Sequence, residues 1–385
     1  MVKKLVVIAI SILVVGLLAP ATVVSAGATD ATTAQTECEY PLQVTDDTGA
    51  EIELDEAPER VVTLMPSDAQ TAFEIGAADR VVGMPVGPAT DHLDVDGQED
   101  ITEEDGFTVD TERVVALEPD VVIAANAAED QLIEQLRDLG LTVYQFSAAE
   151  SIDDVTDNVE LTGQLTDECE GAERTVDWMD DRLDLLASAV EDEEAPLTYY
   201  EMGGGFTAGA DTFQDELMTT AGLENLAAEA GIQSWDIITD EVVADLDPEW
   251  FLYSEGPDGE SPIPDGLDET TAAQEGNDVV VDANQFSQPA PGVVFAVEDI
   301  VETVHPDAYD DIAEDLETVD VEYESADADS DGDDDADATE GADDSDDDAD
   351  ATEGADDSDD ALPGFGVPVA IGALVLSIAL ARRNQ

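Results

Sequence analysis

Hydrophobic residues in the middle of the chain follow two alternating patterns. Short apolar runs such as 61–65 and 121–124 have the length of buried strands, and each precedes a segment whose apolar residues recur every three or four positions, as on one face of a helix. Strands that alternate with helices at this spacing predict a mainly parallel sheet. Because the alternation occurs over residues 58–150 and again over 195–320, we expect two α/β lobes of Rossmann-like topology.

Residues 151–190 lie between the two lobes and carry no strand pattern. Val155, Val159 and Leu183 belong to a series of apolar residues near helical spacing, which is interrupted at most near Asp167. The prediction is one long α-helix that joins the lobes.

The first 26 residues have the layout of a secretory signal peptide. Two lysines precede an apolar run over residues 5–18, and the small residues Val-Ser-Ala end at Ala26, after which we expect cleavage. Retention of this segment as a membrane anchor is the alternative. Residues 27–57 then form an N-terminal segment in front of the first lobe.

The chain changes character again at about residue 321. Residues 321–361 are acidic and contain a 13-residue unit that occurs twice, DDDADATEGADDS, so we expect a disordered stalk. Residues 362–385 are apolar up to Arg382 and Arg383 and are just long enough to span a bilayer, with the arginines in the cytoplasm. The preceding lobes are therefore expected to be held outside the cell, at the membrane.

The charge of the chain indicates the salt concentration in which it folds and the partners that it can bind. The 385 residues include 98 Asp and Glu but 10 Lys and Arg, which gives a formal net charge of -88. Such self-repulsion opposes a compact state unless salt screens it, and the Debye length falls to about 3 Å at 1 M salt. Because 43% of the residues are hydrophobic and fall in periodic runs, we interpret the chain as folded at high salt rather than disordered. No basic surface is available for a nucleic acid.

The chain has two cysteines, Cys38 and Cys169. In an oxidising exterior an even number favours a disulfide, but two free or inert thiols remain the alternative. With His92 and His305 as the sole histidines, we expect no metal site, and we expect no cofactor.

The C-terminal tail resembles a known sorting signal. Pro363, Gly364 and Phe365 precede the apolar segment and its basic end, as in the tails of archaeal surface proteins. The resemblance implies an archaeosortase-type enzyme that exchanges the tail for a lipid anchor. An ordinary tail-anchor helix is the alternative.

The body of the chain resembles the extracytoplasmic substrate-binding proteins of ABC importers for cobalamin, ferric siderophores and haem. The resemblance rests on seven phrases in order, among them "DDTGAEIELDEAPERVVTLMPS", "ERVVALEPDVVIA" and "FTAGADTFQDELMTTAGLENLA". It implies a monomer without catalytic residues that binds a small molecule between two lobes and works with a permease and its ATPase. It also implies that the connecting helix is stiff and the lobes move little.

The same resemblance implies which residues face the ligand. Trp235 is the strongest candidate, because it lies in a polar loop beside a glycine rather than in a periodic apolar run. Met65 and Phe286 could instead belong to the core, and the glycines around Gly204 could form a simple turn. The full set is Met65, Pro66, Ser67, Asp68, Pro88, His92, Met202, Gly204, Phe206, Trp235 and Phe286.

Two acidic residues are implied to dock the permease, one on each lobe. Glu241 matches a family glutamate, and its counterpart lies within Glu99–Asp105, where we take Glu103. On so acidic a surface, each could equally be a solvated side chain.

The arginines of the body favour one ligand class. None of them lies in a predicted ligand loop, whereas anionic catecholate or citrate siderophores need cationic partners. Cobalamin, large and nearly neutral, agrees best with loops of Trp, Phe, Met and Gly, and a neutral hydroxamate siderophore is the second choice. Haem is less favoured because of its propionates. A hydrolase is disfavoured because no GxSxG or HExxH motif occurs, and a structural surface protein is disfavoured by the βα alternation.

Overall fold

A computed structural model of the chain describes residues 37–254 and 261–330. The predicted signal peptide, the acidic repeats and the tail with Pro363, Gly364 and Phe365 lie outside these residues. Within the two described ranges, no helix is both long and apolar enough to cross a bilayer.

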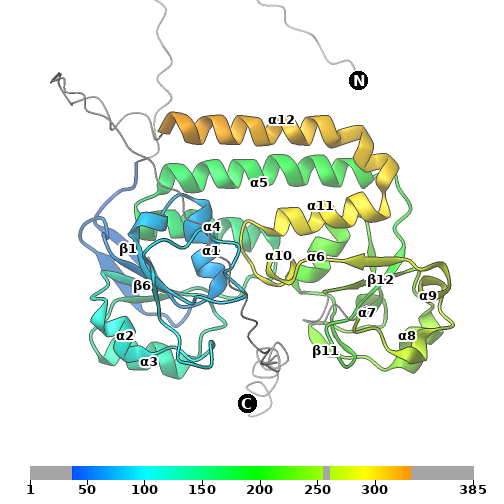
Figure 1. Cartoon of the computed structure of the whole chain (residues 1–385), viewed down its shortest axis with the longest axis horizontal. Helices are drawn as coiled ribbons and strands as arrows, with labels where there is room; N and C mark the ends of the chain where they lie inside the picture. The colour runs from blue at the N-terminus through cyan, green and yellow to red at the C-terminus, as the bar shows by residue number, and fades with distance from the viewer. Residues whose placement is uncertain (1–36, 255–260, 331–385) are drawn as a thin grey trace, which may run out of the picture. The chain divides into compact units, whose positions relative to one another are not determined.

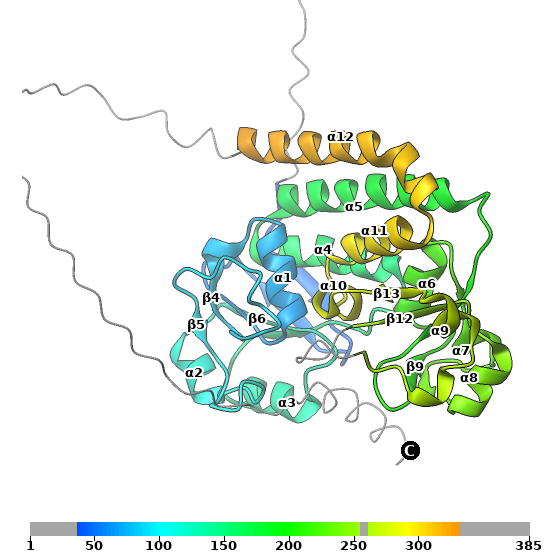
Figure 2. The ribbon, with the colours of Figure 1, turned by 45° about the vertical axis from the view of Figure 1, so that its right-hand side comes forward.

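The N-terminal lobe (residues 40–150) is built on a five-stranded parallel sheet that is covered on both faces (Figure 2). Its elements are β3 (Val61–Thr63), α1 (Pro66–Glu74), η1 (Ala78–Arg80), β4 (Val81–Met84), β5 (Glu99–Asp100), α2 (Thr111–Ala116), β6 (Val121–Ala124), α3 (Asp130–Asp138) and β7 (Val143–Gln145). The strand order is β5-β4-β3-β6-β7.

Both faces of this sheet are apolar, as the continuous valine runs predict. Val62 and Val122 pack against α2 and α3 on one face. Val61 and Val121, one residue earlier on the same strands, point to the other face because side chains alternate along a strand. There they meet an antiparallel hairpin of β1 (Leu42–Thr45) and β2 (Glu51–Leu54), which the sequence did not predict.

The C-terminal lobe (residues 195–305) repeats this plan with a four-stranded parallel sheet in the order β10-β8-β12-β13, and β9 and β11 form a small antiparallel sheet beside it. The strands are β8 (Leu197–Tyr200), β9 (Phe206–Ala208), β10 (Glu224–Asn225), β11 (Trp235–Ile237), β12 (Trp250–Tyr253) and β13 (Asp278–Val280). The helices are α6 (Phe213–Thr220), α7 (Leu226–Glu229), α8 (Asp240–Leu246), η2 (Asp265–Leu267), α9 (Thr271–Glu275), α10 (Ala283–Ser287) and α11 (Val293–Val304). Two lobes with parallel sheets confirm the predicted fold class.

The connection between the lobes is two helices rather than the single helix predicted. It consists of α4 (Ile152–Thr166) and α5 (Cys169–Val190). Asp167 stands between them with a φ of 60°, a left-handed conformation that ends a helix. The break falls at the position where the apolar pattern allowed one.

A further helix, α12 (Pro306–Ser330), corrects the predicted start of the stalk at residue 321 (Figure 1). It packs along α5 and α11, and Figure 1 shows these three helices side by side. The Tyr323 hydroxyl donates to the backbone oxygen of Glu74 on α1, 3.1 Å away. The folded part therefore continues past residue 321, and α12 contacts the N-terminal lobe as well as α5.

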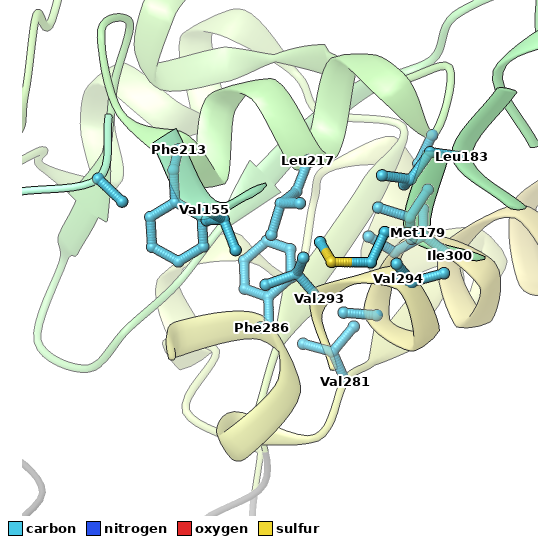
Figure 3. Close-up of a cluster of buried hydrophobic side chains, with 14 of the residues drawn as sticks. Val155, Met179, Leu183, Phe213, Leu217, Val281, Phe286, Val293, Val294 and Ile300 are labelled. Carbon is cyan, nitrogen blue, oxygen red and sulfur yellow. The ribbon is translucent and has the colours of Figure 1, made fainter. Parts of the chain in front are cut away.

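One large hydrophobic cluster joins these helices to both lobes (Figure 3). It contains Val155 of α4, Met179 of α5, Leu217 of α6 and Ile300 of α11, all fully buried. Because the same cluster contains residues of both lobes and of the connection, burial of apolar surface opposes movement of one lobe against the other.

Three arginines join segments that are far apart in the sequence. Arg182 of α5, 2% exposed, forms ion pairs with Glu298 of α11 and Asp320 of α12. Arg80 pairs with Asp167 and Glu168 at the break between α4 and α5, and Arg137 of α3 pairs with Asp46 in the turn of the hairpin.

Cys38 and Cys169 form a disulfide with a Cα–Cα distance of 5.4 Å, so the pairing that the sequence left open is present. It links the segment before β1 to the first residue of α5.

We predict that the Cys38→Ser/Cys169→Ser double variant loses about 2–5 kcal/mol of unfolding free energy, because the bond closes a loop of 131 residues. Guanidinium unfolding in multimolar KCl measures this loss. A reductant should lower the midpoint of the unaltered chain to that of the variant and leave the variant unchanged. Equal midpoints of oxidised chain and variant would contradict the prediction.

Candidate functional site

Each lobe has a topological switch point, where consecutive strands depart to opposite sides of the sheet. In the N-terminal lobe it lies between β3 and β6, and in the C-terminal lobe between β8 and β12. Open α/β sheets bind ligands in the crevice that such a switch creates at the carboxyl ends of the strands. The predicted ligand residues Met65–Asp68 and Met202–Phe206 follow β3 and β8 directly.

A buried carboxylate holds the switch point of the N-terminal lobe together. Asp68, in the first turn of α1, is 5% exposed. Its Oδ2 accepts hydrogen bonds from the backbone N–H of Met65, at 3.1 Å, and of Ala125, at 2.9 Å. Asp68 thereby ties the loop after β3 to the loop after β6. Sequence reasoning placed Asp68 at the start of the helix but could not find its bond to Ala125.

A small cavity of about 30 Å³ opens beside Asp68. Its walls come from α1, from the loops after β6 and β7, from α4, and from Pro289 of the C-terminal lobe. Burial raises the pKa of Asp68 to about 7, although the two backbone N–H groups oppose the shift. The polar residues of the lining are Ser67, Asp68, Thr71, Asn126, Ser147, Asn158 and Thr162.

The C-terminal lobe has its own buried carboxylate at the matching place. Glu201, 1% exposed, follows β8 and accepts hydrogen bonds from the backbone N–H of Gly203, at 2.8 Å, and of Gly205, at 2.9 Å. The Tyr199 hydroxyl donates to its other oxygen, and burial together with Glu201 raises the pKa of Tyr199, so the donor stays protonated. Gly203, Gly204 and Gly205 all have positive φ, which glycine adopts without strain.

The structure places two of the predicted ligand residues beside this loop and Trp235 on the strand that pairs with β9. Trp235 begins β11, which pairs with β9, where Phe206 lies. Trp235 and Met202 are half-buried, and both pack on the edge of the large cluster. Met202 and Phe206 flank the glycine loop, whereas Trp235 pairs with Ala208 at the other end of β9.

Phe286 does not belong to this group. It lies on α10 with no exposed surface, packed edge-on against Tyr200 with ring centroids 5.0 Å apart. Figure 3 shows it inside the cluster with Val293 and Leu217. Because 283–287 fold as a helix rather than extending β13, its ring turns into the core and offers no surface to a ligand.

The loop after β4 lies against the C-terminal lobe. The Pro88 carbonyl accepts from the Asn284 side chain and the Ala89 carbonyl from the Gln288 side chain, each at 3.3 Å. Pro88 and His92 are both exposed. Burial raises the pKa of Glu74, the last residue of α1, and the Gln70 side chain and the charge of His92 oppose this shift.

The two predicted docking residues are exposed on different lobes. Glu241 lies in the first turn of α8, and Glu103 in the turn between β5 and α2. Phe107, 66% exposed, follows Glu103 in the same turn, and Ile237, 64% exposed, precedes Glu241. Both carboxylates are therefore free to meet another surface.

A second cavity, of about 300 Å³, is lined by Arg60, Asp79, Gln98 and Leu117 among others. It lies at the amino ends of β3 and β4, opposite the switch point. The Arg60 guanidinium donates to the Leu117 carbonyl at its edge. No predicted ligand residue lies there.

Sequence reasoning missed several residues of the switch points. Asn126 and Ser147 directly follow buried strands, so the carboxyl-end rule could have found them. Asn158 and Thr162 lie on α4 with no local signal. Glu201 also follows a strand, but nothing in the sequence separates it from the many solvated acids.

Comparisons with known proteins agree with this geometry. A family model described as "Periplasmic binding protein" matches residues 61–284. A protein of Halobacterium salinarum named "Cobalamin-binding protein" is 36% identical over 268 residues, which cover 67% of this chain and 72% of that protein. The Bacillus subtilis protein named "Uncharacterized ABC transporter substrate-binding lipoprotein YvrC" is 26% identical and covers 70% of this chain and 87% of its own length.

The fold is also similar to solved structures. The haem-binding protein HmuT matches with a TM-score of 0.58 and 22% identity, over 71% of this chain and 92% of that one. This likeness concerns the fold alone.

We predict that Glu201→Ala loses roughly 2–4 kcal/mol of unfolding free energy, because the N–H groups of Gly203 and Gly205 lose a charged acceptor. Glu201→Gln should lose much less, since its amide oxygen still accepts from both glycines. Denaturant unfolding measures both, and amide exchange at the glycine loop should accelerate in the alanine variant alone. Equal losses in the two variants would contradict this role.

We also predict that Asp68→Asn is more stable than the unaltered chain above pH 7 and equal to it near pH 4. The folded state keeps the Asp68 proton up to about pH 7, whereas the unfolded state loses it near the ordinary value of 3.8. Between these values the folded state binds more protons, so the contribution of Asp68 to stability falls as pH rises through this window. Asn cannot ionise but still accepts both N–H bonds. Unfolding midpoints at the two pH values test this, and a constant difference would refute it.

Proposed function

Because the chain belongs to the periplasmic binding protein family, we propose that it captures a corrinoid of the cobalamin type between its lobes and delivers it to an ABC permease and its ATPase. The family is one of extracytoplasmic binding proteins, and the Halobacterium salinarum relative carries the name of a cobalamin-binding protein. The proposal transfers that ligand class to this chain.

The observation that carries the ligand choice is the absence of arginine from the described carboxyl-edge loops. Arg80, Arg137 and Arg182 are held in ion pairs elsewhere. Within the described residues, the switch points offer Asp68, Glu201, polar uncharged groups and half-buried Met202, and half-buried Trp235 lies on the adjoining small sheet. Anionic siderophores and the propionates of haem would meet carboxylates without a cation. A nearly neutral ligand with an apolar face agrees better with this surface.

We further propose that the protein works at the outer face of the membrane in high salt. The signal peptide, the acidic stalk and the tail at Pro363–Phe365 support this placement by their sequence. Processing by an archaeosortase-type enzyme would leave a lipid anchor. Glu241 and Glu103, exposed on separate lobes, are the proposed contacts with the permease.

We predict saturable binding of cyanocobalamin to the full chain in multimolar KCl, measured by isothermal titration calorimetry. A ferric hydroxamate and haem should give no saturable heat. Trp235→Ala should weaken cyanocobalamin binding about tenfold, as expected for an aromatic side chain on a ligand face.

The matched control is Trp250→Ala, since Trp250 lies on β12 away from the glycine loop. If the ferric hydroxamate binds and cyanocobalamin does not, the proposed ligand is a siderophore rather than a corrinoid. Equal effects of the two tryptophan substitutions would remove Trp235 from the site.

A further inference from the structure

The position, volume and polar rim of the cavity beside Asp68 are those of a subsite for one small group of a ligand. It lies at the switch point between β3 and β6, and Pro289 brings the C-terminal lobe to its edge. Its volume of about 30 Å³ is the space of one water molecule or of a single small polar group. Asn126 and Ser147 are exposed, so the cavity opens at a polar rim.

The two carboxylate oxygens of Asp68 differ in their hydrogen bonds. Both backbone N–H groups donate to Oδ2. Within the residues that the structure describes, Oδ1 has no hydrogen-bond partner, and Asp68 has no cation within ion-pair distance. Oδ1 is therefore available to accept a hydrogen bond from a donor that enters the cavity.

Other side chains around the cavity can donate. Ser67, Asn126 and Ser147 make no side-chain hydrogen bond to another described residue. By contrast, the hydroxyls of Thr71 and Thr162 already donate to the carbonyls of Ser67 and Asn158 within their helices. The cavity thus combines one strong acceptor with uncommitted donors near its rim.

We propose that this cavity receives one carboxamide group of the ligand, whose N–H donates to Asp68 while its carbonyl accepts from the rim side chains Asn126 and Ser147. The proposal rests on the corrinoid function proposed above. It adds that Asp68 distinguishes a ligand with a carboxamide at this position from one with a carboxylate. A carboxylate in the same place would have no proton to donate and would face Asp68 in a site without a cation.

A metal ion is a poorer occupant. Within the described part of the chain, no three His, Cys, Asp or Glu side chains come together, and the cavity offers a single carboxylate. The remaining lining groups are hydroxyls, amides and apolar side chains.

Asp68 should lose its proton when the ligand binds. No other residue that lines the cavity, on α1, α4, the two loops or the turn before α11, is ionisable, and burial is the main cause of the raised Asp68 pKa of about 7. An N–H donor stabilises the charged form of the carboxyl, so binding lowers this pKa. Near pH 6.5, binding of an amide ligand therefore releases a proton.

The test is calorimetry of the full chain with cyanocobalamin near pH 6.5, in two buffers of different ionisation enthalpy. The unaltered chain should release up to about one proton per ligand bound, and affinity should fall as pH drops from about 8 to 6. Asp68→Asn should abolish the proton release and flatten the pH dependence. Asp157→Asn removes the same charge from an exposed position on α4 and should change neither.

A second arm uses the separated monocarboxylate isomers of cyanocobalamin, each with a single amide hydrolysed. At pH 8 one isomer should bind the unaltered chain at least about tenfold more weakly than cyanocobalamin, and Asp68→Asn should reduce that difference. Asp157→Asn should leave it unchanged.

The outcomes separate this subsite from the function itself. If cyanocobalamin binds without proton release, and Asp68→Asn weakens all corrinoids equally, the amide subsite is wrong while the corrinoid function stands. If no corrinoid binds the unaltered chain, the function is wrong and the subsite falls with it.

Discussion

A formal charge of -88 makes the placement of each cation the constraint on which this structure depends. The body uses its arginines where separate segments meet: Arg182 joins α5 to α11 and α12, Arg80 supports the break between α4 and α5, and Arg137 holds the hairpin turn. Salt screens distant charges but leaves contact pairs largely intact when they are buried. The architecture therefore joins separate segments by a few ion pairs, in which Arg182 is the most buried arginine, and it leaves the described ligand loops without an arginine.

The switch points are stabilised without arginine, by buried carboxylates that accept hydrogen bonds from the backbone. Asp68 and Glu201 are buried without a cation, and backbone N–H groups take the place of a counter-ion. Each carboxylate accepts from two N–H groups and so fixes the geometry of its loop, and burial raises the pKa of Asp68. The two arrangements differ in reach, because Asp68 joins the loops after two strands, whereas Glu201 holds the loop in which it lies.

The sequence predicted the repeating elements well because buried strands and amphipathic helices have local patterns. It could not place Phe286, since the distinction between a strand and a short helix over 283–287 depends on packing against Tyr200. The acidic composition after residue 320 concealed the rest of α12. Apolar residues of this helix from Tyr309 to Tyr323 pack on the large cluster, and Asp320 adds an ion pair with Arg182. Asp68 was predicted for its position, but its bond to Ala125 spans 57 residues and has no local signal.

The course of α12 bears on how a tethered binding protein can dock. The described chain ends with this helix, which lies along α5, while α8 and α3 lie on the opposite side in Figure 1. A tether that begins at α12 therefore starts from the side of the connecting helices and leaves the side with Glu241 of α8 uncovered. If that side meets the permease, the tether must be long enough to let the lobes turn toward the membrane. In the proposed tethered arrangement, residues 331–361 would span at most about 100 Å if fully extended, which gives the lobes room to turn.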